Sequence, residues 1–320
     1  MESIVKHRYW WFLLSLLIIV PGLVSLGLYG LRPSIDFSGG ALWDVYFPDK
    51  QSSDLNTEKL SQLFAAQGFE GAVVQLSTVK LGGKDIPSAL VRTKSLDQNT
   101  AEAQQRNVRT ALQSSYGAAT QLEQVQSVGA TVSQESTRSA VIAVLGACVA
   151  ILVYLTLAFR KAPHPLRYGV CALLAMLHDV LVVLGIASIL GVVLGLEVDA
   201  LFLTALLTVI SFSVHDTIVV FDRIRENLIS RRSGELFEDI VNHSVVQTLP
   251  RSINTQLTSM FTLTALLLFG GSSIRNFVAI LLIGLISGTY SSIFNASQLL
   301  VVWENREWER WFGRREPATA

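Results

Sequence analysis

The chain has 320 residues, half of them hydrophobic, and a positive mean hydropathy. Only 16% of the residues are charged, well below the roughly 25% of a soluble domain. Acidic and basic residues balance at 25 each, which argues against a nucleic-acid-binding surface, because such a surface carries a clustered basic excess. The composition indicates an integral membrane protein.

The sequence lacks the motifs of the common enzyme classes. Gly83-Lys84 is followed by Asp85 rather than Ser or Thr, so no phosphate loop for ATP is predicted. No nucleophile elbow or His-Glu-x-x-His pattern is present. Cys148 and Cys171 lie in apolar runs, where a free thiol behaves as a small hydrophobe, and they predict neither a disulfide nor a metal site. We expect no enzymatic activity, no cofactor and no metal.

The N-terminal segment 1–31 predicts a cytoplasmic end followed by a first transmembrane helix. Residues 9–31 are apolar, and about 20 such residues suffice to cross a bilayer. Lys6 and Arg8 precede this run, which opens with four aromatic residues. A secretory signal would have a shorter apolar core and a small-residue cleavage site. We therefore predict an uncleaved helix with its basic end inside and its aromatic residues at the interface.

Residues 32–138 differ in kind, because they are polar and rich in Gln, Ser and Thr. Local patterns predict strands over 41–47, 72–78, 88–93 and 121–128 and helices over 57–67 and 96–115. This alternation predicts a small α+β domain, which we place on the periplasmic side.

The rest of the chain is mostly hydrophobic and completes a predicted all-α bundle. The first helix is joined by apolar spans over 139–159, 169–190, 200–221, 257–270 and 277–302, which makes six transmembrane helices. The span over 257–270 is short, but it can begin near Pro250 if the polar residues after it face the bundle. These are Ser252, Asn254, Thr255 and Gln256. Within the bundle, 139–302, we expect a cytoplasmic loop over 222–250, and after it a cytoplasmic tail over 303–320.

The distribution of basic residues orients the predicted helices. The loop over 191–199 has no Lys or Arg, and 271–276 has only Arg275. The loops on the other side are rich in basic residues: Arg160, Lys161, Arg167, Arg223, Arg225, Arg231, Arg232, Arg306, Arg310, Arg314 and Arg315. By the positive-inside rule, both termini are predicted to be cytoplasmic.

Asp216 is the most unusual residue of the apolar spans. A charged aspartate near a helix centre costs about 2.5 to 3.5 kcal/mol on insertion scales, so it should be neutral, paired or facing water. At helical spacing Asp216 shares a face with Val220 and Arg223. His215 and Asp222 lie on the next face round. Two interpretations stay open: a buried device for helix packing, or a group that takes up and releases protons.

Arg251, at the predicted cytoplasmic entrance of the fifth span, is the candidate partner of Asp216. An arginine at a helix end can instead extend its side chain to the lipid headgroups. The polar face that follows Arg251 has no use in lipid, and it favours a functional pairing.

His178 and Asp179 form a second histidine-aspartate pair, near the middle of the third span. Chains of such groups move protons through membranes, so this pair is a candidate neighbour in a proton relay. A structural hydrogen-bond role is the alternative.

Two further groups have less specific patterns. Asp222, Arg223 and Glu226 end the fourth span, where a charge cluster is typical of a solvated helix end, although it could also form a polar mouth leading to Asp216. Gly284 and Gly288, followed by Ser291 and Ser292, make a stripe of small residues that predicts a close helix contact.

Several segments, taken together, resemble the SecF family. They are Ile35–Gly40 (IDFSGG), Val125–Gly129, Leu177–Val180 (LHDV), Ser213–Asn227 (SVHDTIVVFDRIREN), Arg251–Ser259 (RSINTQLTS) and Gly288–Ser297 (GTYSSIFNAS). The resemblance covers every predicted span in order, whereas the polar domain matches mainly at its two ends. The long motif of the fourth span is the most specific part.

The resemblance implies a fold, a role and partners. The fold would be six helices in an arrangement like that of RND transporters, with a ferredoxin-like periplasmic domain. The protein would act in the inner membrane with SecD beside the SecYEG channel, and would use the proton gradient to pull unfolded polypeptides outward. Membrane lipid and these proteins are the implied partners, and nucleic acid is not.

The resemblance also implies site residues. The family's membrane aspartate falls on Asp216 and its arginine on Arg251, which would form a proton-responsive site with an aspartate of SecD. Asp222, Arg223 and Glu226 match the end of the same motif. One departure is His215, since family members usually have Asn there. His215 either donates the same hydrogen bond or adds a titrating group.

Two other functions remain open from the sequence. One is half of an RND-type exporter of small molecules, which would need a substrate pocket and a second half. The other is a scaffold that holds the channel's partners together without transport, for which Asp216→Asn would have no effect.

Overall fold

The computed structural model describes residues 4–81, 84–97, 99–160, 162–231, 233–307 and 309. It divides into two compact units, one of residues 1–32 and 142–320 and the other of residues 33–141. The helix α5 (Ala130–Ala158) contributes to both. Five basic residues used to predict the orientation lie outside the described residues: Lys161, Arg232, Arg310, Arg314 and Arg315. Most of the predicted tail after residue 309 also lies outside them.

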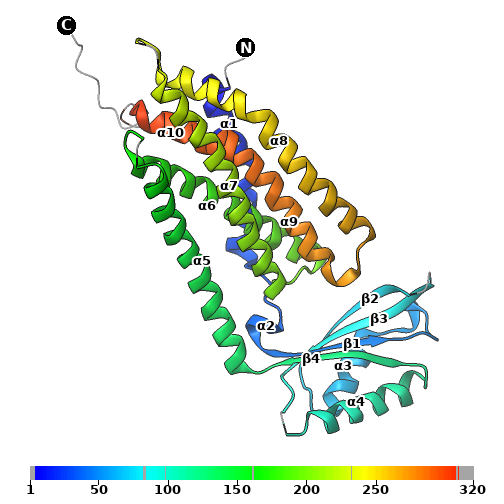
Figure 1. The fold of residues 1–320 in the computed structure, drawn as a ribbon. Coiled ribbons are helices and arrows are strands. Elements are labelled where there is room, and N and C mark those ends of the chain that lie inside the picture. The colour runs from blue at the N-terminus through cyan, green and yellow to red at the C-terminus, as the bar shows by residue number, and fades with distance from the viewer. Residues whose placement is uncertain are drawn as a thin grey trace. The chain divides into compact units, whose positions relative to one another are not determined.

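The unit of residues 33–141 is a four-stranded antiparallel sheet with two helices on one face (Figure 1). After the short helix α2 (Ile35–Ser38), its elements follow in the order β1 (Gly40–Tyr46), α3 (Thr57–Ala66), β2 (Val73–Leu81), β3 (Lys84–Thr93), α4 (Ala101–Tyr116) and β4 (Gln121–Val128). The spatial order of the strands is β2-β3-β1-β4. All four predicted strands are present. The helix predicted over 96–115 begins later, because Asp97 Oδ1 accepts a hydrogen bond from the Asn99 backbone at 2.9 Å and holds a turn there.

The core of this unit forms where β1 meets the two helices. Alternate residues of β1 point inward, and Trp43 is fully buried. Its ring packs edge-on against Phe64 and Phe69, with centroids 5.4 and 5.2 Å away. Its indole N–H donates to Thr93 Oγ1 at 2.9 Å, so the one polar atom of the ring is satisfied.

The other unit is a helical bundle. Its elements are η1 (Val5–His7), α1 (Arg8–Tyr29), the later part of α5, α6 (Pro165–Leu194), α7 (Ala200–Ile229), α8 (Phe237–Phe269), α9 (Ser272–Ser291), the π-helical turn η3 (Ser292–Ala296) and α10 (Ser297–Glu304). In the described part of the chain, five helical segments are long and apolar enough to cross a membrane. α8 is not among them, since polar residues interrupt its apolar run. Residues 222–250, predicted as a loop, are mostly helical, and only 230–236 connect α7 to α8.

Small residues allow α1 and α6 to approach closely. A methyl group added at Gly22 would lie 2.8 Å from the Cα of Gly185, closer than such atoms can approach. Near this contact, the Ser25 and Ser188 hydroxyls are 2.9 Å apart, and Ser188 Oγ also donates to the Gly30 carbonyl at 2.7 Å.

The small-residue stripe of α9 packs against α7, as predicted. A methyl group at Gly284 would lie 2.0 Å from Val209 Cγ2, and one at Gly288 would touch Ser213 at 3.5 Å. The π-helical turn η3 begins at Ser292, whose Oγ donates to the Gly288 carbonyl at 2.8 Å. Such π-turns within helices are frequent at functional sites.

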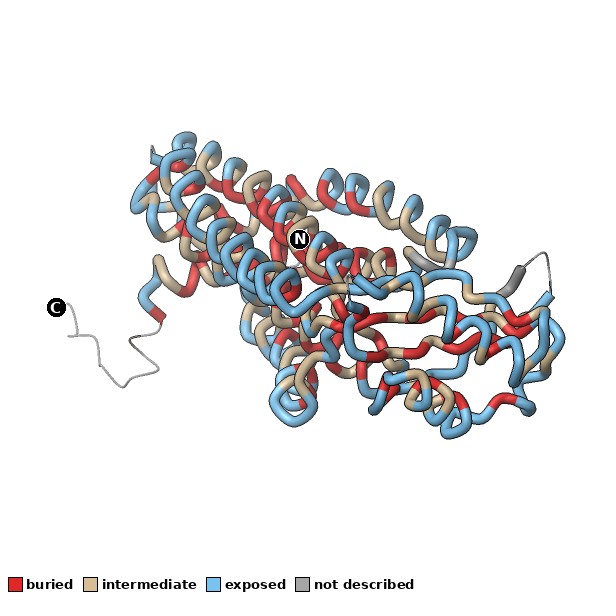
Figure 2. Tube along the Cα trace, turned by 90° about the horizontal axis from the view of Figure 1, so that it is seen from below, coloured by how far each residue is buried: buried red, intermediate tan, exposed pale blue. Residues whose placement is uncertain are grey.

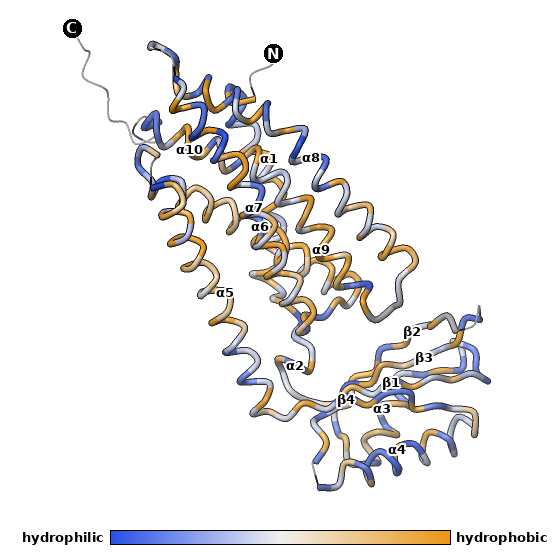
Figure 3. The backbone as a smooth tube through the Cα atoms, in the orientation of Figure 1, coloured by the Kyte–Doolittle hydropathy of each residue, from blue (hydrophilic) through white to orange (hydrophobic). Residues whose placement is uncertain are grey.

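The outer surface of the bundle is mostly apolar, and its polar residues gather at one end. Figure 2 shows buried residues concentrated on the inner sides of the helices, and Figure 3 shows hydrophilic residues gathered where α10 ends and α8 begins. At this end Arg8 Nη2 lies 2.5 Å from Glu307 Oε1, and Arg8 Nη1 lies 3.5 Å from Glu238 Oε2. The first and last described segments therefore lie at the same end of the bundle.

Candidate functional site

Asp216 lies in the middle of α7 and is only 2% exposed. Its neighbours on the same helical face, Val209 and Val220, are buried too, as the spacing predicts. Gln256 Nε2 of α8 donates to Asp216 Oδ2 at 2.5 Å. Gln256 is itself 2% exposed, and its Oε1 has no hydrogen-bond partner among the described residues. Asp216 is thus held by a neutral amide at the contact between α7 and α8.

Arg251 is not brought to Asp216 in this structure. It is exposed on α8, and no ion pair joins the two side chains among the described residues. The physical reason is its helical position: Arg251 precedes Gln256 by five residues, which places the two side chains about 140° apart around the helix at about 100° per residue. The pairing of Arg251 with Asp216 stays a prediction.

The polar residues of α8 divide between two faces. Ser252 and Gln256 are buried and face the bundle, as predicted for the whole set. Asn254 and Thr255 are exposed instead and share an outer face with Arg251. Thr258 and Thr262 continue this face along the helix. A stripe of exposed polar side chains therefore runs along a helix packed within a membrane bundle.

The outer side of α7 carries a similar stripe. Thr204, Ser211, His215 and Asp222 are all exposed, and their spacing of four or seven residues places them on one helical face. His215 therefore points away from the buried side that holds Asp216. By contrast, the exposed residues of α1, and those of α5 from residue 141 onward, are apolar; examples are Leu13, Leu17, Ile142, Leu145 and Val149.

Asp179 of α6 is fully buried and receives hydrogen bonds from three helices. Oδ1 accepts from Ser287 Oγ at 2.6 Å and lies 3.0 Å from Nδ1 of His178. Oδ2 accepts from Ser213 and Ser291, both at 2.6 Å. Both oxygens therefore have two partners, and these contacts join α6, α7 and α9. No hydrogen bond connects Asp179 to Asp216 within the described part of the chain.

The charged end of α7 forms local ion pairs and contacts α8. Arg223 Nη1 lies 2.5 Å from Glu226 Oε2, and Arg225 Nη2 lies 2.8 Å from Asp222 Oδ1. Arg223 Nε also donates to Gln247 Oε1 at 2.6 Å. Because the carboxyl groups are more than half exposed, these pairs are those of a solvated helix end.

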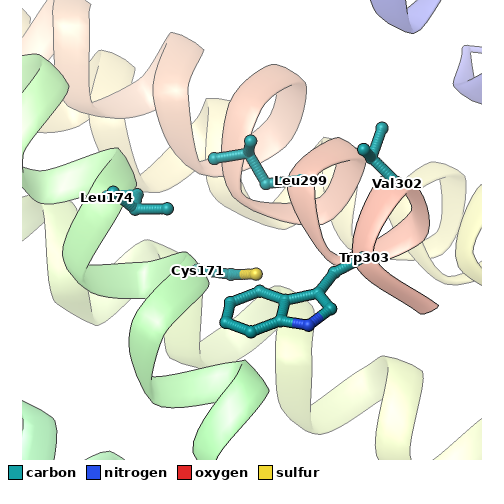
Figure 4. Close-up of a pocket in the computed structure, with 5 residues that line it drawn as sticks. All are labelled: Cys171, Leu174, Leu299, Val302 and Trp303. Atoms are coloured by element: carbon teal, nitrogen blue, oxygen red, sulfur yellow. The ribbon is translucent and has the colours of Figure 1, made fainter. Parts of the chain in front are cut away.

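An apolar hollow lies between α6 and α10 (Figure 4). It has a volume of about 400 Å³ and is lined by Cys171, Leu174, Leu299, Val302 and Trp303. The wall has no charged side chain, so it offers no polar contact for a proton relay or an ion.

The family model of the protein export membrane protein SecD/SecF, C-terminal, matches residues 107–306. A protein translocase subunit SecF from Thermobaculum terrenum is 50% identical over 323 residues, covering 100% of this chain and 99% of the relative. The chain belongs to the SecF family. It is accordingly a multi-pass membrane protein of a family of translocase subunits.

Other relatives combine SecD and SecF in one chain. SecDF of Bacillus subtilis is 34% identical over 305 residues, which are 94% of this chain and 38% of that one. The crystal structure of SecDF from Thermus thermophilus, a translocon-associated membrane protein, matches with a TM-score of 0.76 and 32% identity. That match covers 95% of this chain and 39% of that one, so these relatives have a large further part.

The sequence alone does not identify four polar partners in the site. Gln256 is one of several polar residues predicted on the fifth span, and Ser213 lies within a longer motif. Ser291 belongs to the α9 stripe, whose pattern predicts packing, and Ser287 lies next to Gly288 of that stripe. The spacing of small and hydroxyl residues, Gly284, Ser287, Gly288 and Ser291, was the available signal.

Proposed function

We propose that this chain is the SecF subunit of a complex with SecD that uses the proton gradient to assist unfolded polypeptides through the SecYEG channel. The complex lies in the inner membrane, surrounded by lipid, with both termini of this chain cytoplasmic. The observation that carries the proposal is a buried carboxyl group, Asp216, between two helices whose outer faces are polar at membrane depth.

The proposal includes a fold. We take α8 as the sixth transmembrane helix, because its 33 residues reach about 50 Å at 1.5 Å per residue. Its buried Ser252 and Gln256 face the bundle, which lessens the cost of polar groups in the membrane. The unit of residues 33–141 has the element order β-α-β-β-α-β, which supports a ferredoxin-like domain on the periplasmic side.

SecD is the partner that the outer faces of α7 and α8 require. Lipid chains cannot satisfy the hydrogen-bonding groups of Ser211, His215 and Asn254. Another protein surface can, and relatives such as Bacillus subtilis SecDF carry a large additional part in the same chain. Arg251 lies on the α8 face that SecD would cover, beside the proposed aspartate of SecD.

The coupling step is a change in the charge of Asp216. A protonated Asp216 is neutral, whereas ionised Asp216 needs a partner, and the two candidates on α8 are Gln256 and Arg251. Because these two side chains point about 140° apart, an exchange of partners requires α8 to move against α7. One charge that crosses the membrane field supplies about 2.3 kcal/mol per 100 mV, which suffices to reset such a packing contact. Residues 32–40, which join α1 to the outer domain, would carry the motion outward.

Export assays test this function. The measurement is the proton-gradient-dependent stimulation of polypeptide translocation into membrane vesicles that contain the complex. We expect Asp216→Asn to abolish the stimulation while the variant remains inserted and bound to SecD. The matched control is Asp222→Asn, an exposed carboxyl of the same helix, which should retain it. Full stimulation by Asp216→Asn would contradict the proposal and favour a scaffold.

A further inference from the structure

A row of buried polar side chains runs along α8 toward Asp216. Ser244, Thr248, Ser252 and Gln256 recur at every fourth residue, and they are 0%, 7%, 3% and 2% exposed. Residues four apart form a continuous ridge on a helix surface, and such ridges fit into the grooves of a neighbouring helix. α8 packs against α7, and Gln256 at one end of the row binds Asp216.

The row reaches the polar end of the bundle. Asn227 Nδ2 of α7 donates to Ser244 Oγ at 2.8 Å and to Gln247 Oε1 at 3.1 Å. Gln247 Nε2 lies 2.7 Å from Nε2 of His243, and both groups are at the exposed surface. Polar groups therefore continue from the solvated end of α7 to the buried carboxyl of Asp216.

Two atoms of this row have no partner among the described residues. They are Ser252 Oγ and Gln256 Oε1, one helical turn apart, and both are fully shielded from the outside. Buried polar atoms nearly always form hydrogen bonds, and internal water is the usual partner when the protein supplies none. Thr248 and Ser244, by contrast, donate to backbone carbonyls of their own helix. The part of the row closest to Asp216 is thus the part with free hydrogen-bonding capacity.

The row of buried polar side chains ends at Gln256. Beyond Gln256, the next residues at the same spacing are Met260, Thr264 and Leu268, and α8 ends in the apolar sequence LTALLLF. No polar side chain after Gln256 is buried on α8 in the part of the chain that the structure describes. The row of buried polar side chains thus extends from Asp216 toward the end of the bundle where the first and last described segments lie, and not toward the opposite end.

We propose that the contact between α7 and α8 conducts protons between Asp216 and the water at this end of the bundle, through water bound by Ser252 and Gln256. The inference rests on the proposed function and adds a route to it. A proton that leaves the Asp216 carboxyl passes to bound water, and the water passes a proton of its own toward Ser244 and Asn227, so the carboxyl becomes a carboxylate. Gln256 can serve both states, because its Nε2 donates to the carboxylate and its Oε1 can accept from the protonated acid.

The other titratable groups near this contact are exposed or bonded elsewhere, so they do not provide another path for the proton. On α7, His215 lies on the exposed side, and Arg223 and Glu226 pair with each other at the surface. On α8, Arg251 and His243 are exposed. Within the range of α9 the titratable residues are Arg275, which is exposed, and Tyr290, whose hydroxyl donates to the Trp11 carbonyl at 2.6 Å.

The test compares two substitutions of nearly equal shape at one position. Ser252→Thr keeps the hydroxyl group, whereas Ser252→Val replaces it with a methyl group. The measurement is the initial rate of proton flux through the complete complex with SecD in proteoliposomes under an imposed gradient. We expect Ser252→Thr to keep most of the flux and Ser252→Val to slow it about tenfold, the effect of losing roughly one buried hydrogen bond.

Controls separate this inference from the proposed function. Thr289→Val removes a hydroxyl that only bonds the Leu285 carbonyl of its own helix, and it should leave the flux unchanged. Equal flux in the Thr and Val variants of Ser252, whether high or low, would overturn the route. If Asp216→Asn abolishes flux while both Ser252 variants retain it, the route fails and the proposed function stands. If Asp216→Asn also retains full flux, the proposed function fails with it.

Discussion

Asp179 and Asp216 are both buried in the helical bundle, but their surroundings differ. Asp179 has two partners on each carboxyl oxygen, from three helices, whereas Asp216 accepts a bond from Gln256. Hydrogen bonds from α7 and α9 hold the Asp179 carboxyl in place, whereas the partner of Asp216 is a neutral amide on α8. We therefore assign a structural role to Asp179, and to Asp216 the proton exchange proposed above.

This assignment predicts that the same substitution affects stability differently at the two positions. Asp179→Asn replaces an acceptor with an N–H donor that faces serine hydroxyls, so the free energy of unfolding should fall by about 1 to 3 kcal/mol. Asp216→Asn keeps an acceptor for Gln256, so the stability should change little. Thermal unfolding of both variants, purified with SecD in the same detergent, provides the measurement. Equal stability of the two would contradict the assignment.

Glu307 links the first and last helices and makes this contact sensitive to acid. Burial raises the pKa of its carboxyl, but hydrogen bonds from Arg8 and Tyr9 outweigh burial and hold the pKa below its ordinary value. The folded state therefore binds the proton less tightly than the unfolded chain. The stabilisation is complete above the ordinary pKa of a glutamate, about 4.3, and is lost as the pH falls through the lower folded value.

Glu307→Gln should accordingly lower the melting temperature at neutral pH. The difference from the unmodified protein should shrink as the pH falls below about 4.3. Unfolding measured at a series of pH values checks this, with the exposed Glu226→Gln as the control. A difference that persists unchanged into acid would show that packing, and not charge, accounts for the effect.

The contacts between pairs of helices determine where these side chains lie. α1 and α6 meet at Gly22 and Gly185, and α7 and α9 meet at Gly284. Each contact depends on a missing side chain, so it fixes the axial position of one helix against the other. The contact between α7 and α8 is different, because polar side chains form it, and it is therefore the one we expect to move.

Two glycines of α1 provide a matched test of helix contact. An added methyl group at Gly22 would meet the backbone of α6 at 2.8 Å, whereas one at Gly27 meets nothing within 4 Å. Gly22→Ala should therefore reduce thermal stability and the amount of inserted protein. Gly27→Ala should leave both unchanged or slightly improve them, since alanine favours the helix. If the two variants behave alike, α1 does not pack on α6 in this way.

The helices and strands could be predicted from the sequence more completely than the contacts between them. The strands and the burial of Asp216 followed from periodicities of two and 3.6, which depend only on local residues. The partner of Asp216 did not, because Arg251 and Gln256 lie on one polar helix and the way α8 packs on α7 decides which of them is inward. The serines around Asp179 come from two other helices, α7 and α9, so no local pattern could bring them to it.

The helical bundle has two kinds of outer surface, one apolar and one polar. The outer sides of α1 and α5 are apolar, as lipid requires. The polar outer faces of α7 and α8 require a protein, and we propose SecD. Asp216 lies just inside this polar surface, so a proton step would change the contact between the two subunits.

Cysteine cross-linking tests the position of SecD. In a variant without Cys148 and Cys171, Thr258→Cys on the polar face of α8 should cross-link to cysteines introduced in the membrane helices of SecD. Leu17→Cys, on the apolar face of α1 and 69% exposed, is the matched control and should not. Efficient cross-linking from Leu17 alone would place SecD on the other surface.

Proton flux through the reconstituted complex shows whether the Asp216 carboxyl carries protons. Proteoliposomes that contain this chain and SecD, with an imposed proton gradient, are compared with liposomes that contain the Asp216→Asn complex in equal amount. We expect the unmodified complex to conduct protons and the variant to fall to the level of protein-free liposomes. Equal flux with and without the Asp216 carboxyl would contradict the account.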